Sequence, residues 1–87
     1  YSPKAQVILD AMAQVGEGFI APASISTPRG AIRLASPSTT DDYARVLYAA
    51  LRAADSQGLA RIAVIQPAGD GLALAIRDRL LRASRGR

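Results

Sequence analysis

The fold is decided by residues 39–66, which read TTDDYARVLYAALRAADSQGLARIAVIQ. In the first part of this stretch, apolar side chains recur every three or four residues, as they do on one face of an α-helix. These positions are Tyr43, Val46, Leu47, Ala50, Leu51 and Ala54. Arg45, Arg52 and Asp55 fall on the opposite face, and Tyr48 lies beside the two arginines. The spacing therefore predicts a long helix with one face on a core.

Signals for the ends of this helix agree with the spacing. Thr39 or Thr40 can cap its start, and Gly58 can adopt the left-handed backbone conformation that ends many helices. The uninterrupted apolar run at residues 62–65 then predicts a strand of the kind that is buried on both faces in a parallel sheet.

Shorter runs on either side predict the other elements. Three more strands are expected at residues 7–9, 18–21 and 31–35, where apolar and β-branched side chains cluster. Between the first two, residues 10–15 are expected to form one or two helical turns. Asp10 would be the N-cap of these turns and Gly16 their end.

A second long helix is predicted from about Gly71 to Ser84, with Asp70 as its cap. Its core side is expected to carry Leu72, Ala73, Ile76, Leu80 and Ala83. A strand–helix–strand crossover requires parallel pairing of its two strands. The order of elements thus predicts an α/β fold, a small Rossmann-like sandwich whose mostly parallel sheet of about four strands is flanked by helices.

Composition excludes several classes of protein. The 87 residues suit one small domain, and they include no Cys and no His. A disulfide framework, a zinc finger, a thiol nucleophile and a histidine general base are therefore excluded. Apolar runs such as residues 72–76 are far shorter than the roughly 18 residues of a membrane span. We expect no catalytic or metal site in this chain, no membrane contact and a cytoplasmic location.

Positive charge is concentrated at the C-terminal end. Residues 1–76 carry six basic and six acidic side chains, whereas residues 77–87 carry five arginines against Asp78. Such a helix can form a phosphate-binding face for nucleic acid, or it can simply complement the helix dipole and be solvated. The second interpretation is favoured because no aromatic side chains alternate with the arginines to stack on bases. A free-standing RNA-binding or dimerisation module remains the alternative.

The turn before the second helix carries half of a dinucleotide-binding fingerprint, Gly69-Asp70-Gly71. Non-glycine residues follow it, and the Asp70 carboxylate would repel a phosphate, so a capping role is favoured. The candidate phosphate or domain contacts are Gly69, Gly71, Arg77, Arg79 and Arg82. Asp41 and Asp42 are neighbours in a first helical turn, which suits the helix dipole rather than acid–base chemistry.

Four segments stand out together: residues 1–5 (YSPKA), 43–52 (YARVLYAALR), 61–64 (RIAV) and 71–80 (GLALAIRDRL). In this order and spacing they resemble the C-terminal domain of the Sua5 family, the two-domain L-threonylcarbamoyladenylate synthases. The resemblance implies a parent enzyme that joins L-threonine, bicarbonate and ATP into threonylcarbamoyl-AMP, which supplies the t6A modification of tRNA. ATP, and Mg with it, would bind in a separate N-terminal catalytic domain. The present domain would need no cofactor, would have that catalytic domain as its partner, and would meet the tRNA modification machinery only indirectly.

The resemblance also implies an interdomain linker with the pattern His-Tyr-x-Pro, which lies over the catalytic pocket. Tyr1-Ser2-Pro3 matches its last three positions, so Tyr1 and Pro3 are expected to lie near substrate. Residues 1–5 would be the end of this linker and residues 6–87 the α/β domain. The expected His would precede Tyr1, and the family's Gly-Leu-Gly is replaced by Gly71-Leu72-Ala73, which further weakens a phosphate role for that turn.

Overall fold

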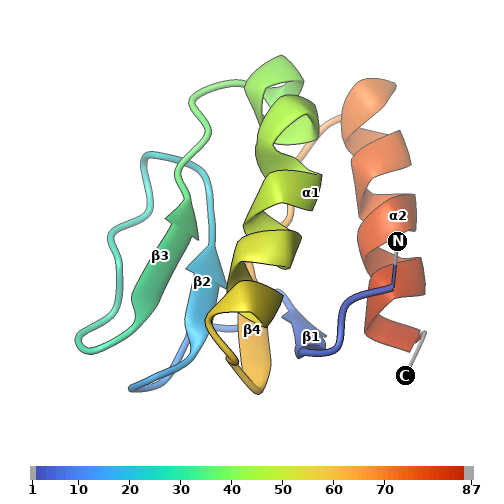
Figure 1. Ribbon diagram of the computed structural model, residues 1–87. Coiled ribbons are helices and arrows are strands. Elements are labelled where there is room, and N and C mark those ends of the chain that lie inside the picture. Colours follow the sequence, from blue (N-terminus) through green and yellow to red (C-terminus); the bar gives the residue numbers. More distant parts are fainter. Residues whose placement is uncertain (1, 86–87) are drawn as a thin grey trace.

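A computed structural model describes residues 2–85 as a four-stranded sheet with two helices. The elements are β1 (Gln6–Leu9), β2 (Gly18–Ile20), β3 (Ile32–Ala35), α1 (Thr40–Ser56), β4 (Arg61–Val64) and α2 (Leu72–Arg85). The strands lie in the order β1-β4-β2-β3, and every neighbouring pair is parallel (Figure 1). The predicted parallel α/β fold is confirmed.

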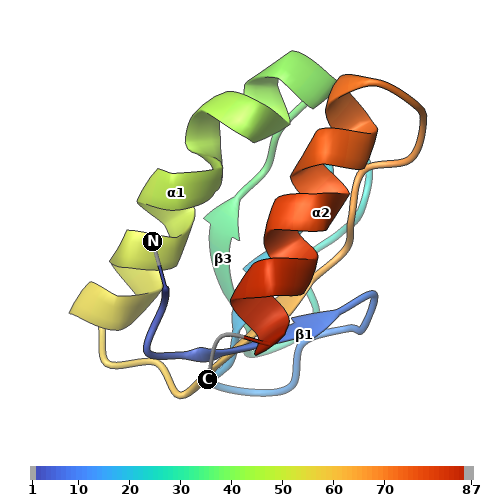
Figure 2. The same cartoon turned by 90° about the vertical axis from the view of Figure 1, so that its right-hand side faces the viewer.

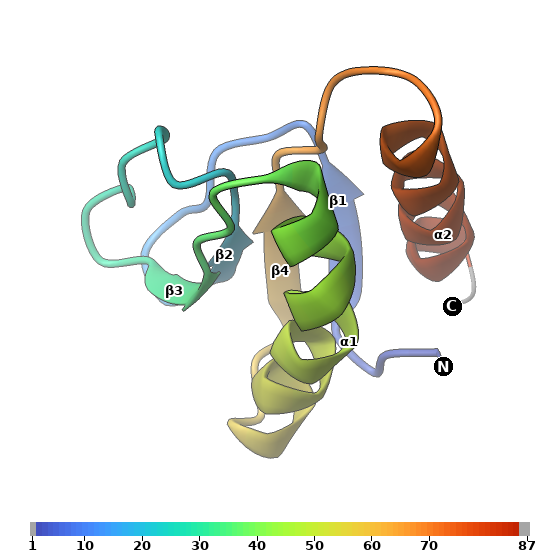
Figure 3. The same ribbon diagram turned by 90° about the horizontal axis from the view of Figure 1, so that it is seen from above.

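Both helices lie on one face of the sheet, and they cross it side by side (Figures 2 and 3). The core between the two layers is apolar, and its largest buried side chains are Tyr43, Leu51, Ile62, Val64 and Leu80. The opposite face of the sheet is covered by the two loops 10–17 and 21–31. These loops enclose a smaller cluster around Phe19, Ala21 and Ala63. Among the described residues, helices therefore flank the sheet on one side only.

The helical turn predicted at residues 10–15 is wrong. Asp10 has a φ of 52°, and its backbone N–H donates to the Val64 carbonyl at 2.6 Å. Its carboxylate accepts from the backbone and side-chain N–H groups of Gln66, at 3.1 and 2.8 Å. The Asp10 side chain therefore joins the ends of β1 and β4 instead of capping a helix, and the chain continues as an irregular loop.

The first long helix begins as predicted. Thr39 is the N-cap, and its hydroxyl accepts from the Asp42 backbone N–H at 3.0 Å. Beyond the helix, Gly58 has a φ of 70°, the left-handed conformation that a glycine adopts without strain. The predicted apolar face is buried except for Val46, which is half-buried.

The second long helix departs from the prediction in its first turn. Ala73, Ile76, Leu80 and Ala83 are buried as expected, but Leu72 is 42% exposed, so its predicted core position is wrong. The first turn of α2 rises above the carboxyl ends of the strands (Figure 1), where Leu72 has no sheet to pack on. The backbone carbonyl of Asp70 accepts from the Ala73 N–H at 3.2 Å. Within residues 2–85, the Asp70 carboxylate accepts no hydrogen bond from this helix.

Arg33 fixes the loop over the helix-free face. All five N–H groups of its guanidinium donate to oxygens at 2.8–3.0 Å. The acceptors are the carbonyls of Ala21, Pro22, Ile25 and Ala35 and the hydroxyl of Thr27. The guanidinium carbon also lies 5.1 Å from the centroid of the buried Phe19 ring. One guanidinium thus holds the 21–31 loop over this side of the sheet.

Candidate functional site

The segment that leads into β1 is held on the domain by α1. The Asp55 carboxylate, in the last turn of α1, accepts from the backbone N–H groups of Lys4 and Ala5 at 3.1 Å. Pro3 is fully buried, and Ala5 is 1% exposed. Figure 2 shows this segment, in dark blue, running beside the end of α1. We call residues 3–5 with Asp55 the linker anchor.

The linker anchor was not predicted from the sequence. Asp55 was expected on the solvent face of the helix, but it is half-buried and bonded to the chain 50 residues before it. Its position could have been found, because it follows the buried Leu51 by four residues and so lies on the same side of the helix. β1 begins at Gln6, where the domain was expected to begin, yet residues 3–5 already pack on the domain.

Of the two residues expected near substrate, only Pro3 is among the described residues. Tyr1 lies outside the described residues. Pro3 is described, and its side chain is fully buried in this domain. Pro3 therefore helps to hold this segment on the domain, and its expected place near substrate stays a prediction.

The candidate phosphate contacts divide into two groups. Gly69 and Gly71 flank a turn with φ values of 115° and 60°, and Arg77 folds back onto it. The Arg77 guanidinium donates to the carbonyls of Pro67 and Gly69 at 2.9 Å. The turn thus offers carbonyl oxygens to its own arginine, and Arg77 stabilises the entry to α2.

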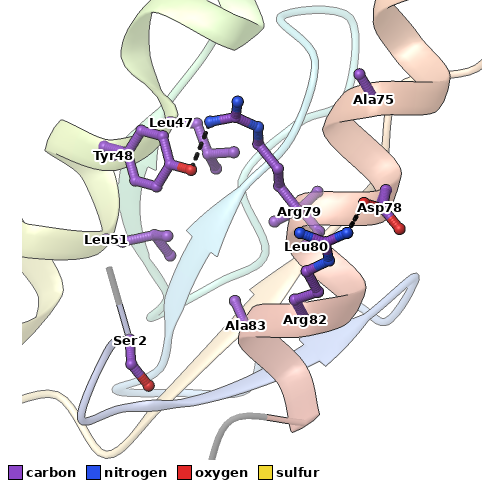
Figure 4. Close-up of a pocket in the computed structure, with 10 residues that line it drawn as sticks. All are labelled: Ser2, Leu47, Tyr48, Leu51, Ala75, Asp78, Arg79, Leu80, Arg82 and Ala83. Carbon is purple, nitrogen blue, oxygen red and sulfur yellow. Dashed lines mark hydrogen bonds and ion pairs between the residues drawn. The ribbon is translucent and has the colours of Figure 1, made fainter.

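Arg79 and Arg82 lie elsewhere, in an open groove between α1 and α2 (Figure 4). The groove is about 740 Å³ in volume, and we call it the interhelical groove. Apolar side chains from both helices line its floor: Leu47, Leu51, Leu80 and Ala83. Ser2 lies at one end, so the interhelical groove adjoins the segment that enters the linker anchor.

The two arginines on the rim of the interhelical groove each have a side-chain partner. Arg79 reaches across from α2 and donates to the Tyr48 hydroxyl at 2.7 Å, with its guanidinium carbon 5.7 Å from the ring centroid. Arg82 pairs with Asp78 at 3.1 Å, one helical turn away. Tyr48 was expected to lie beside Arg45 and Arg52 of its own helix, but in the structure its hydroxyl accepts a hydrogen bond from Arg79 of the other helix.

A third polar cluster lies at the carboxyl ends of β1 and β4. The Tyr43 hydroxyl donates to the Ile65 carbonyl at 2.9 Å, and Tyr43 is 1% exposed. Burial, and to a smaller extent the charge of Asp10, raise the pKa of the Tyr43 hydroxyl well above its usual range. This hydroxyl therefore stays protonated and serves as a fixed donor between α1 and β4.

Neither a metal site nor a membrane span is found in the part of the chain that the structure describes. Among residues 2–85, no three acidic side chains gather closely enough to hold a metal ion. Neither described helix combines the length and apolarity needed to cross a bilayer.

Comparisons with known proteins give one match. The chain matches the family described as "Threonylcarbamoyl-AMP synthase, C-terminal domain" over residues 1–85. No match is found among curated proteins or among solved structures. The family match covers the linker anchor, both helices and the whole sheet. The chain therefore belongs to the Sua5 C-terminal domain family of threonylcarbamoyl-AMP synthase.

Proposed function

We propose that this domain is the accessory domain of a threonylcarbamoyl-AMP synthase and that it acts by holding the interdomain linker. The parent reaction joins L-threonine, bicarbonate and ATP, and its product serves t6A formation in tRNA. The observation that carries the proposal is the linker anchor, in which the Asp55 carboxylate binds two consecutive backbone N–H groups.

The linker anchor gives the linker a fixed far end. A backbone segment loses about 1–2 kcal/mol of conformational freedom per residue when it is ordered. Residues 3–5 are ordered by this domain itself, through burial and the bonds to Asp55. A linker that starts from a fixed point has fewer conformations to lose when it closes over a pocket.

A closed linker suits the chemistry of the parent. Formation of threonylcarbamoyl-AMP passes through a carbamate that water and free diffusion would destroy or disperse. A segment laid over the pocket excludes water and retains the reactants until the next step. In this proposal ATP and Mg bind in the catalytic domain, and Tyr1 and Pro3 are the residues of this chain that lie nearest to substrate.

The proposal is tested in the full-length synthase with Asp55→Asn, which keeps the size of the side chain and removes the charge that binds the Lys4 and Ala5 amides. We expect slower formation of threonylcarbamoyl-AMP and earlier escape of intermediates, with the catalytic domain still folded. Asp41→Asn is the matched control, because it removes an exposed carboxylate from the other end of the same helix.

A truncated enzyme supplies the second arm. Removal of the residues that correspond to this chain should lower activity or product retention at least as much as Asp55→Asn. If both altered enzymes keep the kinetics of the unaltered synthase, the domain does not act through the linker and the proposal fails.

A further inference from the structure

The side of α2 that faces the β1 edge of the sheet carries exposed leucines. Leu74 is 58% exposed and Leu81 is 39% exposed. Their i, i+7 spacing places both on one side of the helix, about 10 Å apart along its axis. They line an open depression of about 320 Å³ together with Leu9, Arg77 and Asp78. We call these five residues the α2 face.

The linker reaches the domain on another side of α2. Ser2 lines the interhelical groove, which α2 shares with α1 (Figure 4). The α2 face instead lies beside β1, the outermost strand at that end of the sheet (Figure 3). The linker anchor therefore does not account for the exposed leucines.

We propose that the α2 face binds the α2 face of a second copy of this domain, so that the parent synthase forms a dimer with twofold symmetry. The two α2 helices run antiparallel, and the twofold axis passes between residues 77 and 78. In this arrangement Leu74 of each copy packs on Leu81 of the other copy. The same surface is used by both copies, as twofold symmetry requires.

The charges along α2 favour a second copy in this direction. Residues at equal distances from the axis meet, so Arg77 lies opposite Asp78 of the second copy. By the same rule, Asp70 at the start of the helix lies opposite Arg85 at the end of the other helix. A parallel pair of helices would instead bring each charge against its own like, which is unfavourable. The antiparallel pair thus matches both the leucines and the charges.

The central pair can form without the loss of a hydrogen bond. Arg77 donates to the carbonyls of Pro67 and Gly69 through Nη1 alone, so its Nη2 can donate to the second copy. Asp78 pairs with Arg82 through Oδ2, so its Oδ1 can accept. Both oppositely charged groups at the axis therefore keep their present partners in the dimer.

The outer pair is available as well. Asp70 and Arg85 are both exposed, and within residues 2–85 neither side chain has a hydrogen bond or ion pair. Each dimer gains two such pairs, one at each end of the helix contact. They add direction to the contact, because surface ion pairs contribute little free energy by themselves.

The test measures the mass of the full-length synthase by sedimentation velocity at concentrations from about 1 to 300 µM. We expect a reversible dimer with a Kd on the order of 100 µM or tighter, as suits a small interface. Leu74→Glu should weaken it at least tenfold, because it places a charge in the apolar contact. Met12→Glu is the matched control, since Met12 is 55% exposed but lies in the loop 10–17 on the helix-free face, and it should leave the Kd unchanged.

A charge exchange tests the antiparallel direction. Asp70→Arg and Arg85→Asp each place like charges opposite one another at both ends of the dimer, so each variant alone should dimerise about tenfold more weakly. A mixture of the two variants has opposite charges at both ends. It should therefore form a mixed dimer as tight as that of the unaltered synthase.

Three results would overturn the proposal. The first is a synthase that stays monomeric throughout, which would mean that the α2 face is covered within one molecule or binds no second copy. The second is a dimer that Leu74→Glu leaves intact, because the contact would then lie elsewhere. The third is a mixture that dimerises as weakly as the single variants. Asp55→Asn should leave the dimer intact, so a failure here is distinct from a failure of the linker proposal.

Discussion

Tyr43 provides the strongest test of how α1 is fixed on the sheet. Tyr43→Phe removes only the hydroxyl, which is buried and donates to the Ile65 carbonyl at 2.9 Å. The ring keeps its space, so the change isolates one hydrogen bond, and we expect a loss of about 1–1.5 kcal/mol in the free energy of unfolding at pH 7. Tyr48→Phe is the matched control, because its half-buried hydroxyl bonds an exposed arginine, and its cost should stay below about 0.5 kcal/mol.

The same hydroxyl predicts a dependence on pH. The unfolded chain ionises Tyr43 near its ordinary pKa of about 10, whereas burial and Asp10 raise the pKa in the fold. Above about pH 10 the unfolded state therefore binds fewer protons than the folded state, and stability falls by up to about 1.4 kcal/mol per pH unit. Tyr43→Phe lacks this loss. The advantage of Tyr43 should thus disappear about one pH unit higher, near pH 11.

The measurement is urea unfolding of the three proteins at intervals from about pH 8 to pH 11, analysed only where the denaturant slopes agree. Tyr48→Phe should follow the unaltered protein and lose stability above about pH 10. Tyr43→Phe should not show that loss. If the curves of Tyr43→Phe and the unaltered protein stay parallel throughout, Tyr43 ionises as easily in the fold as out of it, and the reasoning from burial is refuted.

Two further pairs of substitutions test the two faces of the sheet. Arg33→Lys should lower the free energy of unfolding by about 2 kcal/mol, because lysine cannot replace five planar N–H donors. Its control, Arg29→Lys on the exposed part of the 21–31 loop, should change that free energy by less than about 0.5 kcal/mol, and both are measured by thermal or urea unfolding. Leu80→Ala should lower the free energy of unfolding by about 2–4 kcal/mol because Leu80 is fully buried. Leu72→Ala should lower it by less than about 1 kcal/mol because Leu72 is 42% exposed. Equal losses in the two variants would mean that α2 is rotated from the position described.

The helices and the parallel sheet could be predicted because their signals are local and repeated. Thr39, the spacing from Tyr43 to Ala54, and Gly58 each specify the same helix independently. The prediction of a helical turn at residues 10–15 failed because the contacts that decide this segment are distant in the sequence. Asp10 and Gly16 are typical helix ends, but the partners of Asp10 are Val64 and Gln66, which lie more than 50 residues later in the chain. No sequence pattern around Asp10 predicts these partners.

The candidate site was predictable to a smaller extent. Gly69 and Arg77 were both named as candidate phosphate or domain contacts, and in the structure the Arg77 guanidinium donates to the Gly69 carbonyl. Arg79 and Tyr48 were each noticed, yet their contact depends on how two helices pack. Asp55 was placed opposite the apolar face, although it follows the buried Leu51 by four residues, and its partners, the Lys4 and Ala5 amides, lie about 50 residues earlier in the chain.

The linker anchor and the interhelical groove share one rigid element, and this limits how they can affect each other. Asp55 and Tyr48 both project from α1, whose core face is fixed by fully buried side chains. Any displacement of α1 therefore moves the Asp55 carboxylate and the Tyr48 ring together. Ser2 lines the interhelical groove and directly precedes the buried Pro3, so it lies where the two sites adjoin. A change in the interhelical groove can therefore affect the linker only through α1 or through the segment around Ser2, because two sites are coupled only through an element that both contact.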